Sequence, residues 1–272
     1  MIYEKIQLTK DSYLEVYAAD KTDGFVRKAI LVIPGGGYGV VCSNREGEPI
    51  AMAFLPHGYN AFVLHYSVRE SKNVFPTQLT EASMAMKYIK DNAEKYNIDA
   101  DKVFAVGFSA GGHLTACLGT MWDKKEIYDK IDMEYGYNKP TGVMLIYPVV
   151  SAKYHIDSFY NLLDNDNPSE EMLEECNVEN FVNKNSAPAY IVHTSNDQCV
   201  DVRNSLVLAE AYKKADLMFE LHIYPDAPHG MALGNAITAE GVPKYNNPVL
   251  AKWVENAAIW AEWVIKTGTD KQ

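Results

Sequence analysis

Hydrophobic residues recur along this chain in short apolar runs separated by longer amphipathic stretches, which predicts strands and helices in alternation. Short, mostly apolar runs bounded by turn residues are typical of strands buried in a parallel sheet. Near the N-terminus, residues 2–8 and 13–17 alternate between apolar and polar positions, which predicts an antiparallel pair. The predicted buried strands cover residues 29–33, 60–65, 102–106, 142–147, 189–193 and 219–224.

Helical spacing fills the stretches between these strands. The clearest amphipathic helix is predicted over 77–96, where Leu79, Met86 and Ile89 share one face and charged residues take the other. Because strands and helices alternate, we expect an α/β fold with a mostly parallel central sheet flanked by helices and right-handed crossovers. Further helices are expected over 48–57, closed by Gly58, and over 114–120, 204–215 and 248–266.

The stretch 151–186 interrupts the alternation, because it is polar, carries acidic pairs at 170–171 and 174–175, and fits no sheet strand. It predicts a small helical insertion. One interpretation is a lid or cap over the site, and the other is a surface excursion of two short helices. The chain has no internal repeat, low-complexity segment or long linker, so we expect a single domain over residues 1–272.

Composition narrows the function classes. The 272 residues are 47% hydrophobic and 11% aromatic, enough for a sizeable core. The net charge of −11 argues against a nucleic-acid or anionic-membrane partner, which would need a basic face. The N-terminus lacks an apolar signal-peptide region, and no apolar run approaches a membrane span. Four widely spaced cysteines form no C-x-x-C pair, so we expect reduced thiols, no metal site and a cytoplasmic location.

Ser109 stands in Gly-Phe-Ser-Ala-Gly, between the predicted strand 102–106 and a helix that begins straight after it. This is the G-x-S-x-G pattern, in which a strained strand-to-helix turn raises a serine hydroxyl above the sheet. Gly107 and Gly111 leave room where a β-carbon would clash. The pattern predicts a nucleophile, and the alternative is an ordinary glycine-rich turn whose serine caps the helix.

A serine nucleophile needs a basic histidine and an acid that orients it, in the chain order Ser, Asp or Glu, His. His229 follows the last predicted strand and is the expected base. Asp197 directly follows the penultimate predicted strand and is the expected acid. Asp201 lies nearer the next helix and suits its N-terminus, while Asp226 suits a turn.

Other histidines fit the role of base less well. His193 and His222 fall within predicted strands, so we expect them to be core residues with satisfied hydrogen bonds. His113 follows the serine on its helix and is expected to pack or bond locally. His155 lies in the polar insertion, where it can touch a substrate.

The loop 34–38, Pro-Gly-Gly-Gly-Tyr, follows the first long buried strand. Glycines permit backbone angles that turn successive N–H groups to one side, as an oxyanion hole requires. We assign this role to the N–H groups of Gly36 and Gly37, with that of Ala110. The loop lacks the glycine spacing of nucleotide-binding motifs, so no nucleotide is expected.

Taken together, these motifs resemble the α/β-hydrolases over nearly the whole chain. More narrowly, the sequence is similar to bacterial esterase/lipase-like proteins that include acetylxylan-esterase-like and feruloyl-esterase-like enzymes. Pro34 stands where relatives of the hormone-sensitive-lipase type begin His-Gly-Gly-Gly, and Asp201 stands where a proline is common in the group. The motifs that carry the resemblance are residues 34–38, 45–49, 107–114, 147–148, 193–197, 203–206 and 228–230.

The resemblance implies a serine carboxylesterase without cofactor or metal. Its expected substrate is a small-molecule, short-chain acyl ester, above all an acetyl ester of a sugar or xylo-oligosaccharide. Tyr38, Tyr66 and Tyr154 are candidates for stacking on a sugar. Three tryptophans of the last helix, at 253, 260 and 263, suit either a homodimer interface or the core.

Alternatives remain open at this point. The same residues suit amide, formamide or peptide hydrolysis, although peptidases of the prolyl oligopeptidase type usually carry a further domain. A non-catalytic binding protein on a hydrolase scaffold is the alternative of another class.

Overall fold

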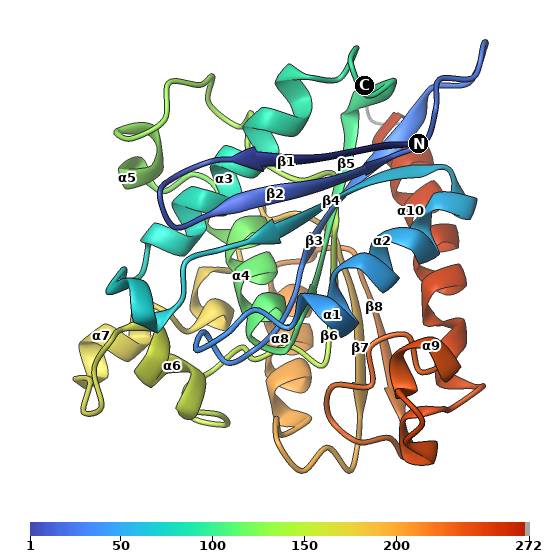
Figure 1. Ribbon diagram of the computed structural model, residues 1–272. Helices are drawn as coiled ribbons and strands as arrows, with labels where there is room; N and C mark the ends of the chain where they lie inside the picture. The colour runs from blue at the N-terminus through green and yellow to red at the C-terminus, as the bar shows by residue number, and fades with distance from the viewer. Residues whose placement is uncertain (270–272) are drawn as a thin grey trace.

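An eight-stranded sheet forms the centre of the computed structural model, which describes residues 1–269 (Figure 1). The strand order is β1-β2-β4-β3-β5-β6-β7-β8. β1 pairs with β2, and β2 with β4, in antiparallel fashion, whereas the pairs from β4 to β8 are parallel. The strands are β1 (Ile2–Gln7), β2 (Tyr13–Ala18), β3 (Arg27–Ile33), β4 (Tyr59–His65), β5 (Ile98–Phe108), β6 (Val143–Ile146), β7 (Ala189–Thr194) and β8 (Phe219–Tyr224).

Helices cover both faces of this sheet, so the mostly parallel α/β fold expected from the sequence is confirmed. Buried residues of α3, α4 and α8 form one core, and those of α2 and α10 form the other. The α-helices are α1 (Ser43–Glu46), α2 (Glu48–Phe54), α3 (Thr77–Asp91), α4 (Ser109–Thr120), α5 (Lys125–Tyr128), α6 (Asp157–Leu162), α7 (Glu170–Glu174), α8 (Arg203–Lys214), α9 (Ala236–Ala239) and α10 (Trp253–Thr269). Short 3₁₀ turns occupy Leu55–His57, Arg69–Ser71, Val178–Phe181, Pro243–Tyr245 and Leu250–Lys252.

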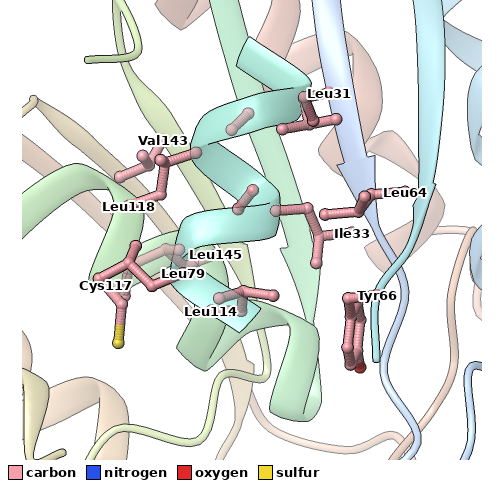
Figure 2. Packing of buried hydrophobic residues seen from close by; sticks show 14 of the residues in the cluster. Leu31, Ile33, Leu64, Tyr66, Leu79, Leu114, Cys117, Leu118, Val143 and Leu145 are labelled. Atoms are coloured by element: carbon pink, nitrogen blue, oxygen red, sulfur yellow. The ribbon is translucent and has the colours of Figure 1, made fainter. Parts of the chain in front are cut away.

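The apolar runs of the sequence are strands that lie between the two cores. Along β3, Leu31 and Ile33 point into the core under α3 and α4, whereas Ile30 and Val32 point into the opposite core. Figure 2 shows Leu31 and Ile33 among the helix residues Leu79 and Leu114. Because both faces of residues 29–33 are covered, polar residues have no favourable position in this buried part of the strand.

Element boundaries differ from the sequence expectation where local chemistry intervenes. The helix predicted to run to 96 ends at Asp91, where the Asn92 side chain donates to the carbonyl of Tyr88 at 2.8 Å. α2 gives way to a 3₁₀ turn at Leu55, because Pro56 has no N–H for the helical ladder. β5 begins at Ile98, four residues earlier than expected, since Ile98 pairs with Arg27.

The insertion lies between β6 and β7 and holds α6, α7 and the 3₁₀ turn at Val178–Phe181, so its helical character agrees with the sequence. Figure 1 places α6 and α7 toward the lower end of the sheet, together with α1 and α9. The helix α9 was not expected from the sequence. It follows the last strand within a long loop that carries His229.

The tryptophans of α10 are divided between the core and the surface. Trp253 and Trp260 are buried in the core beside α2, which contradicts an interface role for these two residues. Trp263 is exposed. The last helix therefore uses its aromatic residues mainly to cover the sheet.

Two helical glycines provide a matched test of packing at the turn after β5. A β-carbon on Gly111 of α4 would lie 2.2 Å from the Ile33 carbonyl oxygen and 2.3 Å from that of Pro34, whereas one on Gly268 of α10 would meet nothing within 4 Å. Gly111→Ala should lower the free energy of unfolding by about 2–3 kcal/mol, the upper part of the usual range for overpacking. Gly268→Ala should change it by less than about 1 kcal/mol, toward greater stability. Urea denaturation measures both, and equal effects would contradict the packing argument.

Candidate active site

Ser109 occupies a tight turn between β5 and α4. Its φ angle is +52°, in the left-handed region that a residue other than glycine rarely adopts. The turn can close because Gly107, two residues before the serine, has no side chain. A β-carbon on Gly107 would lie 2.0 Å from the Thr115 hydroxyl oxygen and 2.2 Å from the Gly111 carbonyl oxygen. The serine is 9% exposed and lines a cleft.

The structure brings Ser109, His229 and Asp197 together in one chain of hydrogen bonds. The Nε2 atom of His229 lies 2.8 Å from the Ser109 hydroxyl oxygen. Its Nδ1 atom lies 2.7 Å from Oδ2 of Asp197. Because the carboxylate accepts the Nδ1 proton, Nε2 carries a lone pair and accepts the serine O–H. This arrangement can remove the proton from the serine hydroxyl.

Asp197 is held in the ionised state by its surroundings. Burial raises the pKa of this carboxyl, but hydrogen bonds from His193 and His229 outweigh burial, so the pKa lies well below its usual range. Backbone N–H groups of Cys199 and Val200 also donate to Oδ1, at 2.9 and 3.0 Å. His193 is a buried residue whose ring nitrogens are both hydrogen-bonded, as expected, and its Nε2 atom also lies 3.4 Å from the Asp197 carboxylate, a contact that its position in a strand did not predict.

The other candidate acids have separate partners. Asp201 accepts hydrogen bonds from the backbone and side chain of Arg203 at the start of α8, as its sequence position suggested. Asp226 accepts a hydrogen bond from the side-chain amide of Asn196. In the described part of the chain, neither carboxylate contacts His229.

His113 bonds locally inside the core, as expected. Its ring lies 2.8 Å from the Tyr38 hydroxyl and 2.8 Å from the Cys176 carbonyl oxygen. Burial lowers the pKa of His113 to about 4, so the ring is neutral at physiological pH.

The glycine loop faces the same space as the serine. Gly36 has a φ angle of +126° and Gly37 one of +62°, which favour glycine. Within residues 1–269, no protein acceptor takes the N–H group of either glycine. Ala110, the third predicted donor, is fully buried in the first turn of α4 behind Ser109.

A cleft of about 390 Å³ opens above the serine. His155 and Ser158, which belong to the insertion, line it, so this segment borders the candidate site. Cys199 lines it from the loop after β7. The lining residues are Gly36, Gly37, Cys42, Asn44, Arg45, Glu46, Ser109, His155, Ser158, Cys199, His229 and Gly230.

Two of the tyrosines expected to stack on a sugar are unavailable for that role. Tyr38 and Tyr66 are 1% and 2% exposed, and their hydroxyls bond to His113 and to the Pro34 carbonyl oxygen. They support the glycine loop from below. Tyr154 is half-buried under the Arg203 guanidinium and does not line the cleft.

Glu46 was missed as a site residue, although it belongs to the motif at 45–49. Its side chain accepts hydrogen bonds from the Gly35 N–H and the Tyr147 hydroxyl, both at 2.7 Å. Burial raises the pKa of Glu46, while these two hydrogen bonds oppose that effect. The local sequence gives no signal that this carboxylate, the last residue of α1, will be buried.

The described residues offer no grouping of three or more His, Cys, Asp or Glu side chains suited to a metal ion. Over residues 1–269, none of the helices combines the length and apolar character that crossing a bilayer requires.

A serine hydrogen-bonded to a histidine that is itself hydrogen-bonded to an aspartate, at one end of a mostly parallel sheet with helices on both faces, defines an esterase-like α/β-hydrolase. The comparisons with known proteins agree and are more specific. The chain belongs to the BD-FAE family, whose model matches residues 14–212.

Several relatives carry names that bear on the substrate. The chain is 38% identical, over 81% of its length, to endo-1,4-beta-xylanase B of Butyrivibrio fibrisolvens, of which it covers 35%. It is 27% identical, over 76% of its length, to the acetylxylan esterase of Xylanibacter ruminicola, of which it covers 42%. The chain therefore spans less than half the length of each of these two relatives.

A solved structure matches over nearly the whole of both chains. It is the acetyl ester-xyloside bifunctional hydrolase of Caldicellulosiruptor lactoaceticus, which is 30% identical, with a TM-score of 0.82 and 96% of each chain covered.

Replacing Asp197 by Asn should change how stability depends on pH. Because the pKa of Asp197 is lowered by folding, its ionised form stabilises the protein above the unfolded value of about 4. As the pH falls below that value the unfolded chain takes up the proton first, and the contribution is lost completely only below the folded pKa. The difference in free energy of unfolding between wild type and Asp197→Asn should therefore shrink from about pH 5 to pH 3.

Asp201→Asn is the matched control. The side-chain hydrogen bond with Arg203 lowers the pKa of Asp201, but this carboxylate lies near solvent, so the effect should be much smaller. Urea denaturation at each pH measures both variants. A stability difference for Asp197→Asn that stays constant over this range would contradict the account.

Proposed function

We propose that the protein is a serine carboxylesterase that hydrolyses short-chain acyl esters, with acetyl esters of sugars or xylo-oligosaccharides as its substrates. The observation that carries this proposal is the unbroken chain of hydrogen bonds from Ser109 through His229 to Asp197. Its components lie in the order and at the distances that acyl transfer by a serine requires.

In the first step, the Ser109 oxygen attacks the ester carbonyl while Nε2 of His229 takes the hydroxyl proton. The carboxylate of Asp197 stabilises the imidazolium that forms. The alcohol leaves with the proton from His229, and the acyl group stays on Ser109. In the second step, His229 takes a proton from water, which attacks the acyl-enzyme. The bond from the acyl carbon to the Ser109 oxygen breaks, His229 returns the proton to that oxygen, and the acid leaves.

The negative oxygen of each tetrahedral intermediate needs preorganised donors. The N–H groups of Gly36 and Gly37 suit this role, because they have no protein acceptor in the described chain and their residues line the cleft beside Ser109. The N–H of Ala110 is the third proposed donor. The start of α4, a helix of twelve residues, adds a favourable dipole at the same place.

The residues of the insertion that line the cleft favour a substrate whose alcohol part is polar, such as a sugar. Nδ1 of His155 donates to the Cys199 carbonyl oxygen at 3.1 Å, so its Nε2 accepts from the Ser158 hydroxyl at 3.1 Å. Burial lowers the pKa of His155, which favours this neutral state. The oxygen of Ser158 then keeps lone pairs for a hydroxyl of the substrate. A β-carbon on Gly37 would lie 3.9 Å from that oxygen, so Ser158 lies beside the glycine loop in the lining of the cleft.

The names of the relatives point toward acetylated xylan and xylosides. Of the two bond types concerned, the site favours the ester over the glycoside. A glycosidase generally uses two carboxyl groups that flank the scissile bond. Among the described residues that line the cleft, Glu46 is the one carboxylate, and both of its oxygens already accept protein hydrogen bonds.

Hydrolysis of p-nitrophenyl acetate by wild type and Ser109→Ala tests the proposal. Wild type should hydrolyse the ester, and the variant should lose at least about 10³-fold in kcat, because the covalent route needs the serine. Asp201→Asn, which changes a carboxylate that does not contact His229, should stay within about twofold of wild type. The residual rate of Ser109→Ala reports any hydrolysis that does not use this serine.

Acetylated xylo-oligosaccharides and p-nitroacetanilide, the amide counterpart of p-nitrophenyl acetate, serve as the second and third substrates. The proposal predicts release of acetate from the sugar ester and little from the anilide. Activity on the anilide alone would favour an amidase. Equal activity of wild type and Ser109→Ala on all three compounds would contradict a serine esterase.

A further inference from the structure

Glu46 is a buried carboxylate that lines the cleft and ends α1, the short helix that begins at Ser43, after the glycine loop. It is 5% exposed, although a buried carboxylate is costly unless its oxygens are paired. Each oxygen has one partner at 2.7 Å: Oε2 accepts the N–H of Gly35, and Oε1 accepts the hydroxyl of Tyr147. These two partners belong to different parts of the site.

The first partner belongs to the glycine loop. Gly35 precedes the two proposed oxyanion donors, so the orientation of its peptide group sets the path of the chain into Gly36. The contact is close on this side: a β-carbon on Gly35 would lie 2.8 Å from Oε2 of Glu46 and 2.8 Å from the Phe108 carbonyl oxygen. Glu46 therefore holds the loop against the end of β5, next to Ser109.

The second partner, Tyr147, contacts both His229 and the loop that carries it. The Tyr147 hydroxyl donates to Glu46 and accepts the N–H of Ala232 at 3.0 Å, in the loop that carries His229. The ring of Tyr147 also lies edge-on to the His229 ring, with centroids 4.9 Å apart. Tyr147 is 2% exposed and has a φ angle of +39°, so its position is tightly constrained.

The neighbouring residue Arg45 reaches the same loop from the other side. Its Nη2 atom donates to the Gly230 carbonyl oxygen at 2.6 Å, and its Nε atom to that of Thr238 at 3.1 Å. Two consecutive residues of α1 thus connect the glycine loop with the histidine loop.

The pairing of Glu46 suits its ionised form. A carboxylate accepts at both oxygens, so it can take the Gly35 N–H and the Tyr147 O–H together. The negative charge also favours a positive charge on the nearby His229 ring, which appears only when the histidine has taken the serine proton.

We propose that Glu46 is a positioning residue of the active site, which through Gly35 and Tyr147 fixes the oxyanion loop and His229 relative to each other. This inference rests on the proposed function of the site. Glu46 exchanges no proton with the substrate in this role. It acts by holding the groups that do, and misplacement of such groups by about 1 Å can reduce the rate about 10²-fold.

Glu46→Gln tests the proposal, because the amide has the same shape but one oxygen fewer to accept a hydrogen bond. We expect kcat for p-nitrophenyl acetate to fall about 10- to 100-fold with KM changed less than about threefold, since the lost interactions matter mainly in the transition state. Tyr147→Phe should produce a similar loss. The double variant should be no more than about threefold worse than the poorer single variant, because both changes break one network.

Glu81→Gln is the matched control. Glu81 is 1% exposed and accepts hydrogen bonds from the Ser67 N–H and hydroxyl at 2.8 and 2.9 Å, but it does not line the cleft. Its replacement removes the same charge from an equally buried site. We expect a lower Tm for both glutamine variants, with kcat within about twofold of wild type for Glu81→Gln alone.

A second readout separates this proposal from the proposed function. A fluorophosphonate reacts with an activated serine whatever its natural substrate: the serine oxygen bonds to phosphorus, fluoride leaves, and His229 takes the hydroxyl proton. Mass spectrometry should show labelling at Ser109 that is about 10- to 100-fold slower in Glu46→Gln and unchanged in Glu81→Gln.

Each outcome has a definite meaning. Labelling of wild type without hydrolysis of any ester would contradict the proposed function alone. Three results would overturn the positioning role alone. In the first, Glu46→Gln is labelled and hydrolyses the ester as fast as wild type. In the second, Glu46→Gln and Glu81→Gln lose kcat equally, and in the third, the losses of Glu46→Gln and Tyr147→Phe add up in the double variant. Absence of labelling at Ser109 in wild type would overturn both.

Discussion

The close packing of α4 against the ends of β3 and β5 is the contact on which the rest of the site depends. The turn at Ser109 joins the buried strand β5 to this buried helix. A β-carbon at Gly107 or Gly111 would overlap backbone atoms within 2.2 Å. Since α4 can approach the ends of β3 and β5 this closely, the serine hydroxyl, the start of the helix and the glycine loop all meet at one point. The positive φ of Ser109 is a local strain that the surrounding packing sustains.

The parallel sheet explains how distant residues reach this turn. Ser109 and His229 are 120 residues apart, yet their side chains lie 2.8 Å from each other. Each follows a strand, β5 and β8 respectively, and Asp197 follows β7 between them in sequence. Because the carboxyl ends of parallel strands share one edge of the sheet, the loops after these strands are neighbours. The short helix α1 then ties the glycine loop to the histidine loop from below.

Those parts of the molecule that obey a repeating pattern could be predicted from the sequence. Buried strands appear as apolar runs because both faces of the sheet are covered, and the G-x-S-x-G turn has a spacing imposed by steric contact. The positions of His229 and Asp197 followed from their places after predicted strands. Their mutual contact agrees with that expectation, while their catalytic role remains a proposal.

Other parts of the site could not be predicted, because they depend on tertiary contacts that no local sequence pattern indicates. Nothing in the sequence around Glu46 distinguishes a buried carboxylate from an exposed one, since its partners Gly35 and Tyr147 are chosen by the tertiary fold. Likewise, His155 reaches the cleft only because the insertion returns toward the loop after β7. Tyr38 was misjudged for the opposite reason: an aromatic residue beside a glycine loop suits a binding surface, but here it fills the core.

The central claim is that ester hydrolysis passes through an acyl group on Ser109, and its most direct test is to observe that group. Wild type should be mixed with p-nitrophenyl acetate, quenched with acid within the first turnovers and digested for mass spectrometry. The account predicts an acetyl group on the peptide that contains Ser109, together with a burst of p-nitrophenol that matches the amount of enzyme. Steady hydrolysis with no acetylated Ser109, or with the acetyl group on another residue, would contradict it.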